Sequence, residues 1–369
     1  MISVLGGYGE VGTAAVRALL ALGLGPLRIG GRDGAAARAL VRTLDAPSLE
    51  AAEADFMDRS SLARFVSGCR VLLNCAGPSH LIGAGPALVA LEEGADYVDV
   101  AGDDGLYALL DDADYREQGC RALLSAGLQP GLTGLLPRWL AATGFDKVSR
   151  LVSYFGLLDH FTAVAADDYL QSVEDGFGRP LAAWRQGCRP GVLVRNSDAG
   201  LPFFPGRVTA LPYLNREAER IASSLELEQG DWYTVVAGRH TLAALDWVHG
   251  MSREGAASLL QRSSRLDMAG RTPFVTLLVQ LGGRVVSGEQ RTRSLAFRGH
   301  RNSELTGAFA AVVTRAALEQ NILPGRQFAA MSVEPVSAVE SLLATGMVSG
   351  LTVLDGPLEM FTEAEEGAL

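Results

Sequence analysis

At the start of the chain, a strand, a glycine-rich turn and a helix follow one another without a gap. This order constrains the fold more than any other feature. The apolar residues Ile2, Val4 and Leu5 predict a short buried strand. The Ala- and Leu-rich stretch 14–23 predicts a helix, and the sequence GGYGEVG (residues 6–12) stands between the two. Together the three parts predict a strand–turn–helix unit.

The glycine spacing in this turn is typical of a loop that binds a pyrophosphate. We expect Gly7 to allow the tight turn, Gly9 to let the pyrophosphate approach the backbone, and Gly12 to let the helix lie close on the strand. The N–H groups at the helix start and the helix dipole attract phosphate charge. An ordinary turn between strand and helix is the alternative. The residues expected to contact a dinucleotide here are Gly7, Tyr8, Gly9, Glu10, Val11 and Gly12.

Two charged residues follow the second predicted strand, 27–30, where a dinucleotide-binding fold meets the adenosine ribose. The fork of Arg32 suits a 2′-phosphate and favours NADP(H), whereas Asp33 could accept hydrogen bonds from the ribose hydroxyls and favours NAD(H). Arg32 comes first after the strand, so we expect NADP(H). Asp33 could instead cap the next helix.

Two later strand ends complete the expected cofactor site. Asp55 ends the predicted strand 49–56 and is either close to the adenine or an acid in a surface turn. The small residues after the fourth predicted strand leave room for the ribose and the nicotinamide. These residues are Asn74, Cys75, Ala76, Gly77 and Pro78.

The chain is long enough for two domains. Strands and helices alternate from residue 2 to about 126, which predicts an α/β domain with a doubly wound parallel sheet. From about Thr133 this alternation is lost. Two β-rich runs, 274–281 and 284–288, flank Gly282-Gly283 and predict a hairpin with its turn at the glycine pair. We therefore expect a second α/β (α+β) domain with a mixed or antiparallel sheet.

The first half contains five motifs, whose order and spacing match those of a known family. In chain order they are GGYGEVG, GGRD, NCAGP, GADYVDVAGD and GLQPGLTGLLP. Over residues 1 to about 137 they resemble the saccharopine dehydrogenase-like family. The resemblance implies a Rossmann-type dinucleotide-binding domain at 1–132, completed by about 323–355. From the residues alone, this last part fits the second domain equally well. It also implies an inserted substrate and dimerisation domain at 133–322. Gln129 departs from the family, in which Asp is common at this position, so the substrate can differ.

The resemblance implies NAD(P)-linked oxidoreduction, often at a carbon–nitrogen bond. We expect an NADPH-dependent reductase that transfers hydride to an imine (C=N) bond of a small metabolite or a carrier-bound intermediate. One alternative is an enoyl or carbonyl reductase of lipid or polyketide metabolism. Another is a regulator that binds NADP(H) and catalyses nothing.

Three residues are candidates for the catalytic chemistry. Tyr97 and Asp99 end the fifth predicted strand, where Tyr97 could donate a proton and Asp99 could hold an iminium cation. Their structural alternative is a core position for Tyr97 and a turn cap for Asp99. His160 follows a predicted strand of the second half, and its imidazole suits proton delivery near neutral pH. His80, after NCAGP, could reach the nicotinamide ribose.

Composition and charge indicate which classes of binding partner do not fit the chain. The net charge of −10 argues against nucleic acid and anionic membranes. The sequence shows no apolar run long enough to span a membrane, no signal peptide and no metal-ligand spacing. Four cysteines without a CxxC pair favour a cytoplasmic protein with free thiols.

The long hairpin predicts a homodimer through sheet contacts, and the acidic tail from Phe361 is expected to fray. Aromatic residues that could line an apolar pocket are Tyr154, Trp184, Tyr233 and Trp247.

Overall fold

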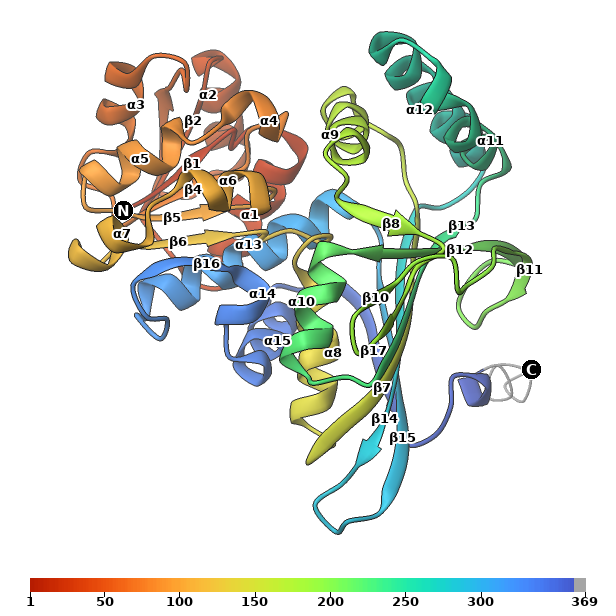
Figure 1. The fold of residues 1–369 in the computed structure, drawn as a ribbon. Helices are drawn as coiled ribbons and strands as arrows, with labels where there is room; N and C mark the ends of the chain where they lie inside the picture. The colour runs from red at the N-terminus through yellow and green to blue at the C-terminus, as the bar shows by residue number, and fades with distance from the viewer. Residues whose placement is uncertain (362–369) are drawn as a thin grey trace. The chain divides into compact units, whose positions relative to one another are not determined.

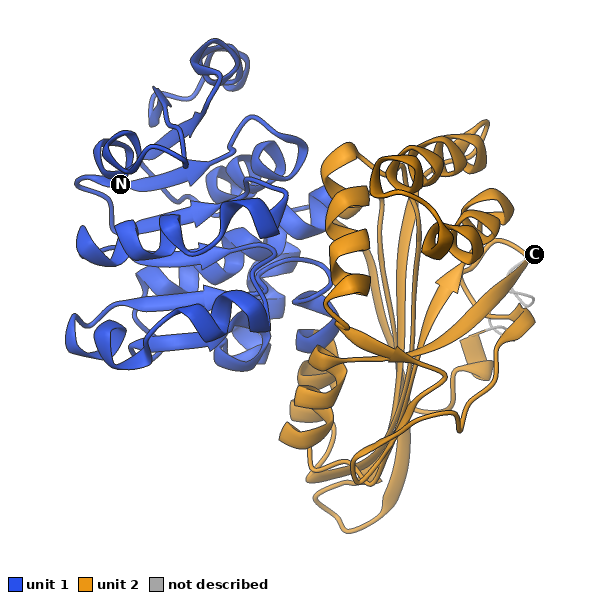
Figure 2. Ribbon diagram, turned by 45° about the horizontal axis from the view of Figure 1, so that its top comes forward, with its two compact units in different colours: residues 1–135, 303–347 blue, residues 136–302, 348–369 orange. Residues whose placement is uncertain are grey.

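The computed structural model describes residues 1–361, and the expectation for the acidic tail concerns residues outside this range from residue 362 on. The chain forms two compact units (Figure 2). Unit 1 comprises residues 1–135 and 303–347, and unit 2 comprises residues 136–302 and the chain from residue 348 on. Helix α8 (Leu132–Ala142) runs across the first boundary.

Unit 1 is a parallel sheet of seven strands in the order β16-β6-β5-β4-β1-β2-β3 (Figure 1). Strand order reverses between β1 and β4, as in a doubly wound fold. The strands are β1 (Ile2–Leu5), β2 (Leu27–Gly31), β3 (Leu49–Glu53), β4 (Val71–Asn74), β5 (Asp96–Asp99), β6 (Arg121–Leu124) and β16 (Gly325–Phe328). This confirms the predicted α/β fold class.

Helices pack on both faces of this sheet (Figure 2). One face buries apolar residues of α3, α5 and α7 against the strands. Helix α13 is buried nearly all round and approaches α1 so closely that a Cβ at Gly307 would overlap Ala15. The helices of unit 1 are α1 (Glu10–Ala21), α2 (Gly34–Leu44), α3 (Arg59–Val66), α4 (Ser79–Ile82), α5 (Gly85–Glu92), α6 (Asp104–Leu109), α7 (Asp112–Glu117), α13 (Asn302–Leu318), α14 (Ala329–Ser332) and α15 (Pro335–Ala344).

Burial explains why the central strands were readable from the sequence. Strands β1, β4 and β6 are buried at all four positions, because helices cover both faces and neighbouring strands cover both edges. The edge strand β3 (LEAAE) instead has half-buried and exposed positions. Mostly apolar, fully buried runs therefore mark the centre of the sheet, where the candidate site lies.

Unit 2 is built on a mixed sheet of ten strands, in which β7 pairs in parallel with β13 and antiparallel with β14. Its strands are β7 (Lys147–Leu158), β8 (Gly178–Pro180), β9 (Ala183–Arg185), β10 (Cys188–Arg189), β11 (Asn196–Gly200), β12 (Arg207–Asn215), β13 (Gln229–Val236), β14 (Phe274–Arg284), β15 (Gln290–Gly299) and β17 (Val348–Leu354). Its helices are α9 (Ala163–Glu174), α10 (Arg216–Ser224), α11 (Arg239–Trp247), the 3₁₀ turn η1 (Val248–Gly250) and α12 (Arg253–Met268). The expected mixed sheet is confirmed.

The predicted hairpin exists, but its turn was placed wrongly. Gly282 and Gly283 lie inside β14, where the register against β7 shifts, and the turn lies at 285–289 before β15. A Cβ at Gly283 would lie 2.8 Å from Val148 Cα. The glycine therefore serves the close approach of two strands at a bulge rather than a chain reversal.

The boundaries of the two units differ from the expected ones. Helix α13, which we expected in the second domain, belongs to unit 1 apart from its first residue. Strand β17, which we expected to complete the first domain, pairs with β15 in the sheet of unit 2. Among residues 1–361, no helix combines the length and the apolar character that a membrane crossing requires.

Candidate functional site

The glycine turn between β1 and α1 is shaped by Gly6. This residue has φ +71°, and an added Cβ would lie 2.7 Å from the backbone nitrogen of Ala76. The sequence predicts the tight turn at Gly7, but the left-handed conformation that favours glycine belongs to Gly6. Gly7 has a packing role, because a Cβ there would lie 2.7 Å from a methyl group of Ile29.

The remaining two glycines of the turn are placed very differently. A Cβ at Gly12 would overlap Gly6 O and lie 2.6 Å from Gly7 Cα, so the start of α1 lies directly on the turn as expected. A Cβ at Gly9 would meet, among the described residues, one atom within 4 Å, which is Gly6 O at 3.3 Å. The fold requires glycine at position 12 but tolerates a side chain at position 9. Glycine at position 9 thus fits a ligand approaching from outside.

The N-terminus of α1 points its backbone donors away from the helix. Gly9 is the N-cap, and the helical hydrogen bonds begin with Thr13 N–H donating to Gly9 O at 2.8 Å. The dipole of α1 favours negative charge at this end of the helix. Binding of a pyrophosphate there remains a prediction.

At the end of β2, Arg32 and Asp33 take different positions. Asp33 Oδ1 accepts the N–H groups of Ala35 and Ala36, both at 2.9 Å, so this carboxylate caps α2. The Arg32 side chain is exposed, and its guanidinium carbon lies 5.8 Å from the centre of the Phe56 ring. The helix-cap alternative for Asp33 is therefore present in the structure, and Arg32 presents its charge to solvent.

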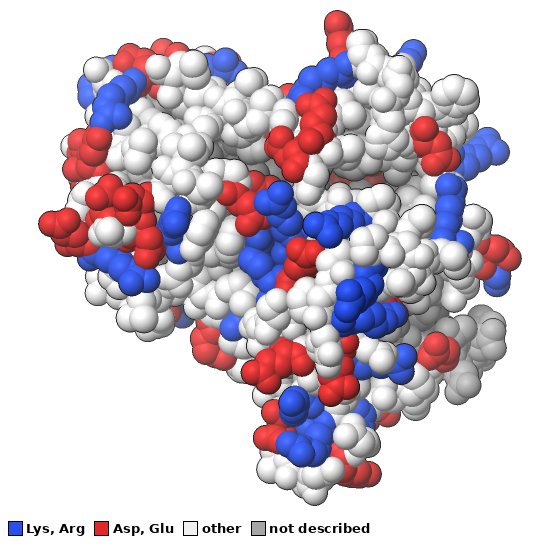
Figure 3. Space-filling model, in the orientation of Figure 1, with Lys and Arg blue, Asp and Glu red and all other residues white. Residues whose placement is uncertain are grey.

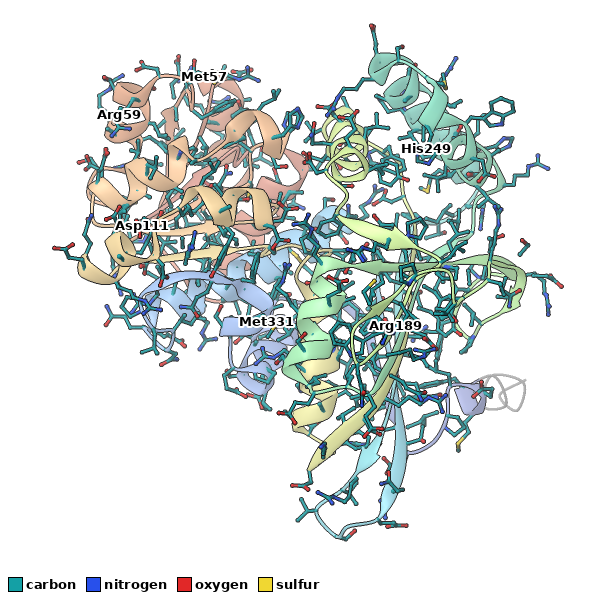
Figure 4. All side chains as sticks on the ribbon, in the orientation of Figure 1. Met57, Arg59, Asp111, Arg189, His249 and Met331 are labelled. Carbon is teal, nitrogen blue, oxygen red and sulfur yellow. The ribbon has the colours of Figure 1, made fainter. Side chains whose placement is uncertain are left out.

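Asp55 closes the turn after β3. Its Oδ1 accepts the Met57 N–H at 3.0 Å, and its own N–H donates to Ser61 Oγ at 3.2 Å. Met57 and Arg59 lie on the same side of unit 1 (Figure 4). Met57 is 75% exposed, and Arg59, at the start of α3, pairs with Glu92. These are the contacts of a turn acid, and contact with the adenine remains a prediction.

The ends of β4 and β5 are joined by buried side chains. Asn74 is 1% exposed, its amide nitrogen donates to Asp99 Oδ2 at 3.0 Å, and its Oδ1 accepts the Ala76 N–H at 3.1 Å. The Tyr97 hydroxyl also donates to Asp99 Oδ2. The NCAGP segment thus begins at a fixed position beside Gly6.

The other oxygen of Asp99 holds the loop that follows β5. Oδ1 accepts the N–H groups of Ala101 and Gly102 at 2.9 and 2.8 Å, and the residue is 3% exposed. Burial, and next the Asp99 charge, raise the pKa of the Tyr97 phenol well above its usual value. The same two causes raise the pKa of the Cys75 thiol. Tyr97 and Asp99 make the contacts that their structural alternative expects.

His160 stands after β7 in unit 2 and is held by the residue before it. Its Nδ1 lies 3.1 Å from Asp159 Oδ1, and its backbone N–H donates to the same oxygen at 2.9 Å. Asp159 Oδ2 accepts the Asn302 N–H at 3.1 Å, and Arg301 lies 3.7 Å from Oδ1. A largely buried carboxylate therefore orients the imidazole, as in histidines that transfer protons. His80 lies exposed on α4.

Two of the four aromatic candidates meet. Tyr154 and Tyr233 stack with ring centres 4.7 Å apart, whereas the Trp184 indole donates to Leu227 O and Trp247 is 72% exposed on α11. The four residues are thus not gathered in one place. All four cysteines are free, and among residues 1–361 no His, Cys, Asp or Glu cluster has the composition of a metal site.

Sequence reasoning missed the roles of three residues. Gly6 was detectable, because it belongs to the GG pair of the turn. Asp159 is the sequence neighbour of His160, but its contact with Asn302 joins residues distant in sequence. Phe56, below the Arg32 guanidinium, comes from a different strand end, and no local pattern predicts that contact.

The fold and this site define a Rossmann-type dinucleotide-binding protein. A glycine turn opens α1, a guanidinium stands at the end of β2, and small residues follow β4 at the point where strand order reverses. A dinucleotide fits these residues, because the turn presents backbone rather than side chains where the pyrophosphate would lie.

Comparison with known proteins gives the family. Residues 2–123 match the family model of the saccharopine dehydrogenase NADP binding domain. The structure of saccharopine dehydrogenase (L-Glu forming) from Saccharomyces cerevisiae is 14% identical, with a TM-score of 0.66 over 96% of this chain and 99% of that chain. Residues 2–123 are therefore similar to the saccharopine dehydrogenase NADP-binding domain. The chain as a whole has a saccharopine dehydrogenase-like fold, which confirms the resemblance carried by the motifs.

More distant structures also match. A meso-dapdh mutant from Clostridium tetani E88 is 13% identical with a TM-score of 0.46, covering 92% of this chain and 95% of that chain. The WlbA dehydrogenase from Thermus thermophilus, in complex with NAD and UDP-GlcNAcA, is 13% identical with a TM-score of 0.42. It covers 93% of this chain and 92% of that chain. No curated protein matches the chain in sequence.

Proposed function

We propose that the protein is an NADPH-dependent reductase that transfers hydride to the C=N bond of a small metabolite or a carrier-bound intermediate. The NADP-binding domain family of residues 2–123 and the saccharopine dehydrogenase-like fold support this proposal. The bound nicotinamide supplies the hydride. The chain has two tasks, which are to hold the dinucleotide and to control a proton.

The proposed preference for NADPH depends on the different positions of Asp33 and Arg32 at the end of β2. Asp33 Oδ1 is occupied by two N–H groups of α2, while the Arg32 guanidinium is exposed. A 2′-phosphate would gain charge-assisted hydrogen bonds from Arg32. A ribose 2′-hydroxyl would have to share the Asp33 carboxylate with the helix cap. This arrangement favours NADPH over NADH.

His160 is our candidate for the proton donor. Asp159 holds Nδ1 and so fixes the tautomer and the direction of the ring. Tyr97 is less suited, because it is fully buried and its hydroxyl proton points at Asp99. We assign Tyr97 and Asp99 a positioning role for the ends of β4 and β5.

An acceptor screen tests the proposed reaction. The purified chain is incubated with NADPH and, in turn, with cyclic imines, with α-keto acids plus an amine, with ketones and with enoyl thioesters, and loss of NADPH absorbance is followed. Turnover with C=N acceptors alone is the expected result. Turnover with enoyl thioesters or ketones alone would contradict imine reduction and favour an enoyl or carbonyl reductase of lipid or polyketide metabolism. Tight NADPH binding without turnover of any acceptor would favour the regulator.

A further inference from the structure

The side chain of Tyr8 connects two loops of the cofactor site. Tyr8 lies in the glycine turn, yet its hydroxyl accepts the backbone N–H of Asp33 at 3.0 Å. This contact joins the turn after β1 to the turn after β2, across 25 residues of sequence. The hydrogen bond places the tip of the glycine turn against the loop that carries Arg32.

The Tyr8 ring also fits a space left by Gly31. A Cβ at Gly31, the last residue of β2, would lie 2.7 Å from both Cε1 and the hydroxyl oxygen of Tyr8. Any other residue at position 31 would displace the ring. The absence of a side chain at Gly31 therefore makes room for the Tyr8 ring. In the GGRD motif, glycine serves packing and arginine supplies positive charge.

Arg32 stands between two anchored neighbours. Gly31 is covered by the Tyr8 ring, and Asp33 is held through its N–H by Tyr8 and through its carboxylate by α2. The backbone of Arg32 is fixed in this way, while its long side chain reaches over the Phe56 ring into solvent. A guanidinium on a fixed backbone loses less entropy when it binds an anion than one on a mobile loop.

We propose that Tyr8 is a specificity-determining positioning residue, which holds Arg32 for the 2′-phosphate of NADPH and keeps the Asp33 carboxylate on its helix cap. This inference rests on the proposed function. It predicts that Tyr8 acts on the discrimination between NADPH and NADH, which share the pyrophosphate, rather than on dinucleotide affinity in general.

The Tyr8→Phe variant removes one oxygen and keeps the ring. We expect its NADPH affinity to fall about threefold to tenfold, the effect of one hydrogen bond, with NADH affinity unchanged. Affinity for 2′,5′-ADP should fall by the same factor and affinity for 5′-ADP should stay. Tyr8→Ala should show a larger loss of the same kind, because the ring contact with Gly31 is lost as well.

Tyr115→Phe is the matched control. Tyr115 belongs to the same unit, and its buried hydroxyl donates to Ala87 O at 2.9 Å on a helix outside the site. This variant should lose thermal stability and keep its selectivity. In an Arg32→Ala background, Tyr8→Phe should no longer change NADPH affinity, because the two residues act as one unit.

Equal loss of NADPH and NADH affinity in Tyr8→Phe, or selectivity equal to wild type, would overturn the inference while tight NADPH binding by the wild type still supports the proposed function. Failure of the wild type to bind either dinucleotide would overturn both. Full additivity of Tyr8→Phe and Arg32→Ala would also contradict the role given to Tyr8.

Discussion

At the scale of single residues, we propose that the charge of Arg32 at the end of β2 sets the preference for NADPH. Replacing Arg32 with Ala removes the exposed guanidinium, so we expect NADPH affinity to fall about tenfold to a hundredfold, the range for a hydrogen bond to a charged group. NADH affinity should stay within about twofold. Arg42→Ala, in the last turn of α2, is the control for a lost positive charge. Equal weakening of both dinucleotides would point to Asp33 and to NAD.

A second prediction at this scale concerns the proton. We expect His160→Gln to lower kcat by about a hundredfold, the size of a general acid contribution, while NADPH affinity is unchanged. Asp159→Asn keeps the shape of the pair but weakens the hold on Nδ1, and it should lower kcat by a smaller factor. Full activity of His160→Gln in steady-state kinetics would remove His160 from the mechanism.

Residue types at strand ends were predictable, and the caps made by Asp33 and Asp99 were among the expected alternatives, but the sequence did not decide between cap and ligand contact. The sequence places Arg32, Asp33, Asn74 and Asp99 at the carboxyl ends of parallel strands, because apolar runs mark the strands before them. Whether a carboxylate binds a ligand or caps a helix depends on backbone N–H groups two or three residues on. Asp33 and Asp99 both accept such N–H groups, which a pattern of residue types does not reveal.

At the scale of elements, the two glycines of the β1–α1 turn should respond differently to alanine. Gly12→Ala places a Cβ against Gly7 Cα at 2.6 Å and should destabilise the fold, by about 2 kcal/mol or more, as expected for overpacking. Gly9→Ala meets the protein at 3.3 Å and should keep the wild-type melting temperature.

Cofactor titration separates the two variants further. Gly9→Ala should bind NADPH much more weakly than wild type, because the methyl group stands where the pyrophosphate approaches. A Gly9→Ala variant with wild-type affinity for NADPH would remove the pyrophosphate assignment of this turn, whatever its stability.

Helices and strands were predicted best where the local pattern of apolar residues alone determines them. The strands and helices of unit 1 follow from buried runs that alternate with amphipathic segments. The error at Gly282-Gly283 arises because a glycine pair favours a turn locally, whereas here β7 approaches β14 at that point. Contacts with a distant strand override the local preference, and the sequence alone does not show them.

At the scale of the whole molecule, buried tyrosines predict how stability depends on pH. Burial raises the pKa of Tyr97 well above 10 and raises the pKa values of Tyr154 and Tyr169 to about 12. A raised pKa in the folded state means stability that is fully present below pH 10 and is lost as the pH rises further. The loss should be about 1.4 kcal/mol per pH unit for each tyrosine that stays protonated.

Urea unfolding at a series of alkaline pH values measures this loss. Tyr97→Phe should show a shallower decline above pH 10 than wild type, even though its stability at neutral pH is lower through the loss of a donor to Asp99. The same slope in both proteins would show that Tyr97 titrates alike in the folded and unfolded states.

We also propose a homodimer, although β17 covers the outer edge of the hairpin along residues 294–299 of β15. Strand β17 covers β15, so the last strand on that side of the sheet is Val348–Leu354, which carries no charge. Uncharged edge strands readily pair with another chain. Sedimentation should give a dimer, and Thr352→Lys should give a folded monomer. A wild-type monomer at micromolar concentration would end this idea.

Charge on the face drawn in Figure 3 is mixed rather than sorted. Figure 3 shows basic and acidic side chains interspersed on the visible face, and the net charge is −10. We therefore expect binding of the anionic cofactor to depend on two local features, the N-terminus of α1 and the Arg32 side chain. Affinity for NADPH should accordingly fall with rising salt more steeply than affinity for NADH.

The most direct test of the account is a titration of the purified wild-type chain with NADPH and with NADH, followed by nicotinamide fluorescence. We expect both to bind at the glycine turn, with NADPH tighter by about tenfold or more because of Arg32. Tighter NADH binding would contradict the assignment of Arg32, and binding of neither would contradict the dinucleotide site itself.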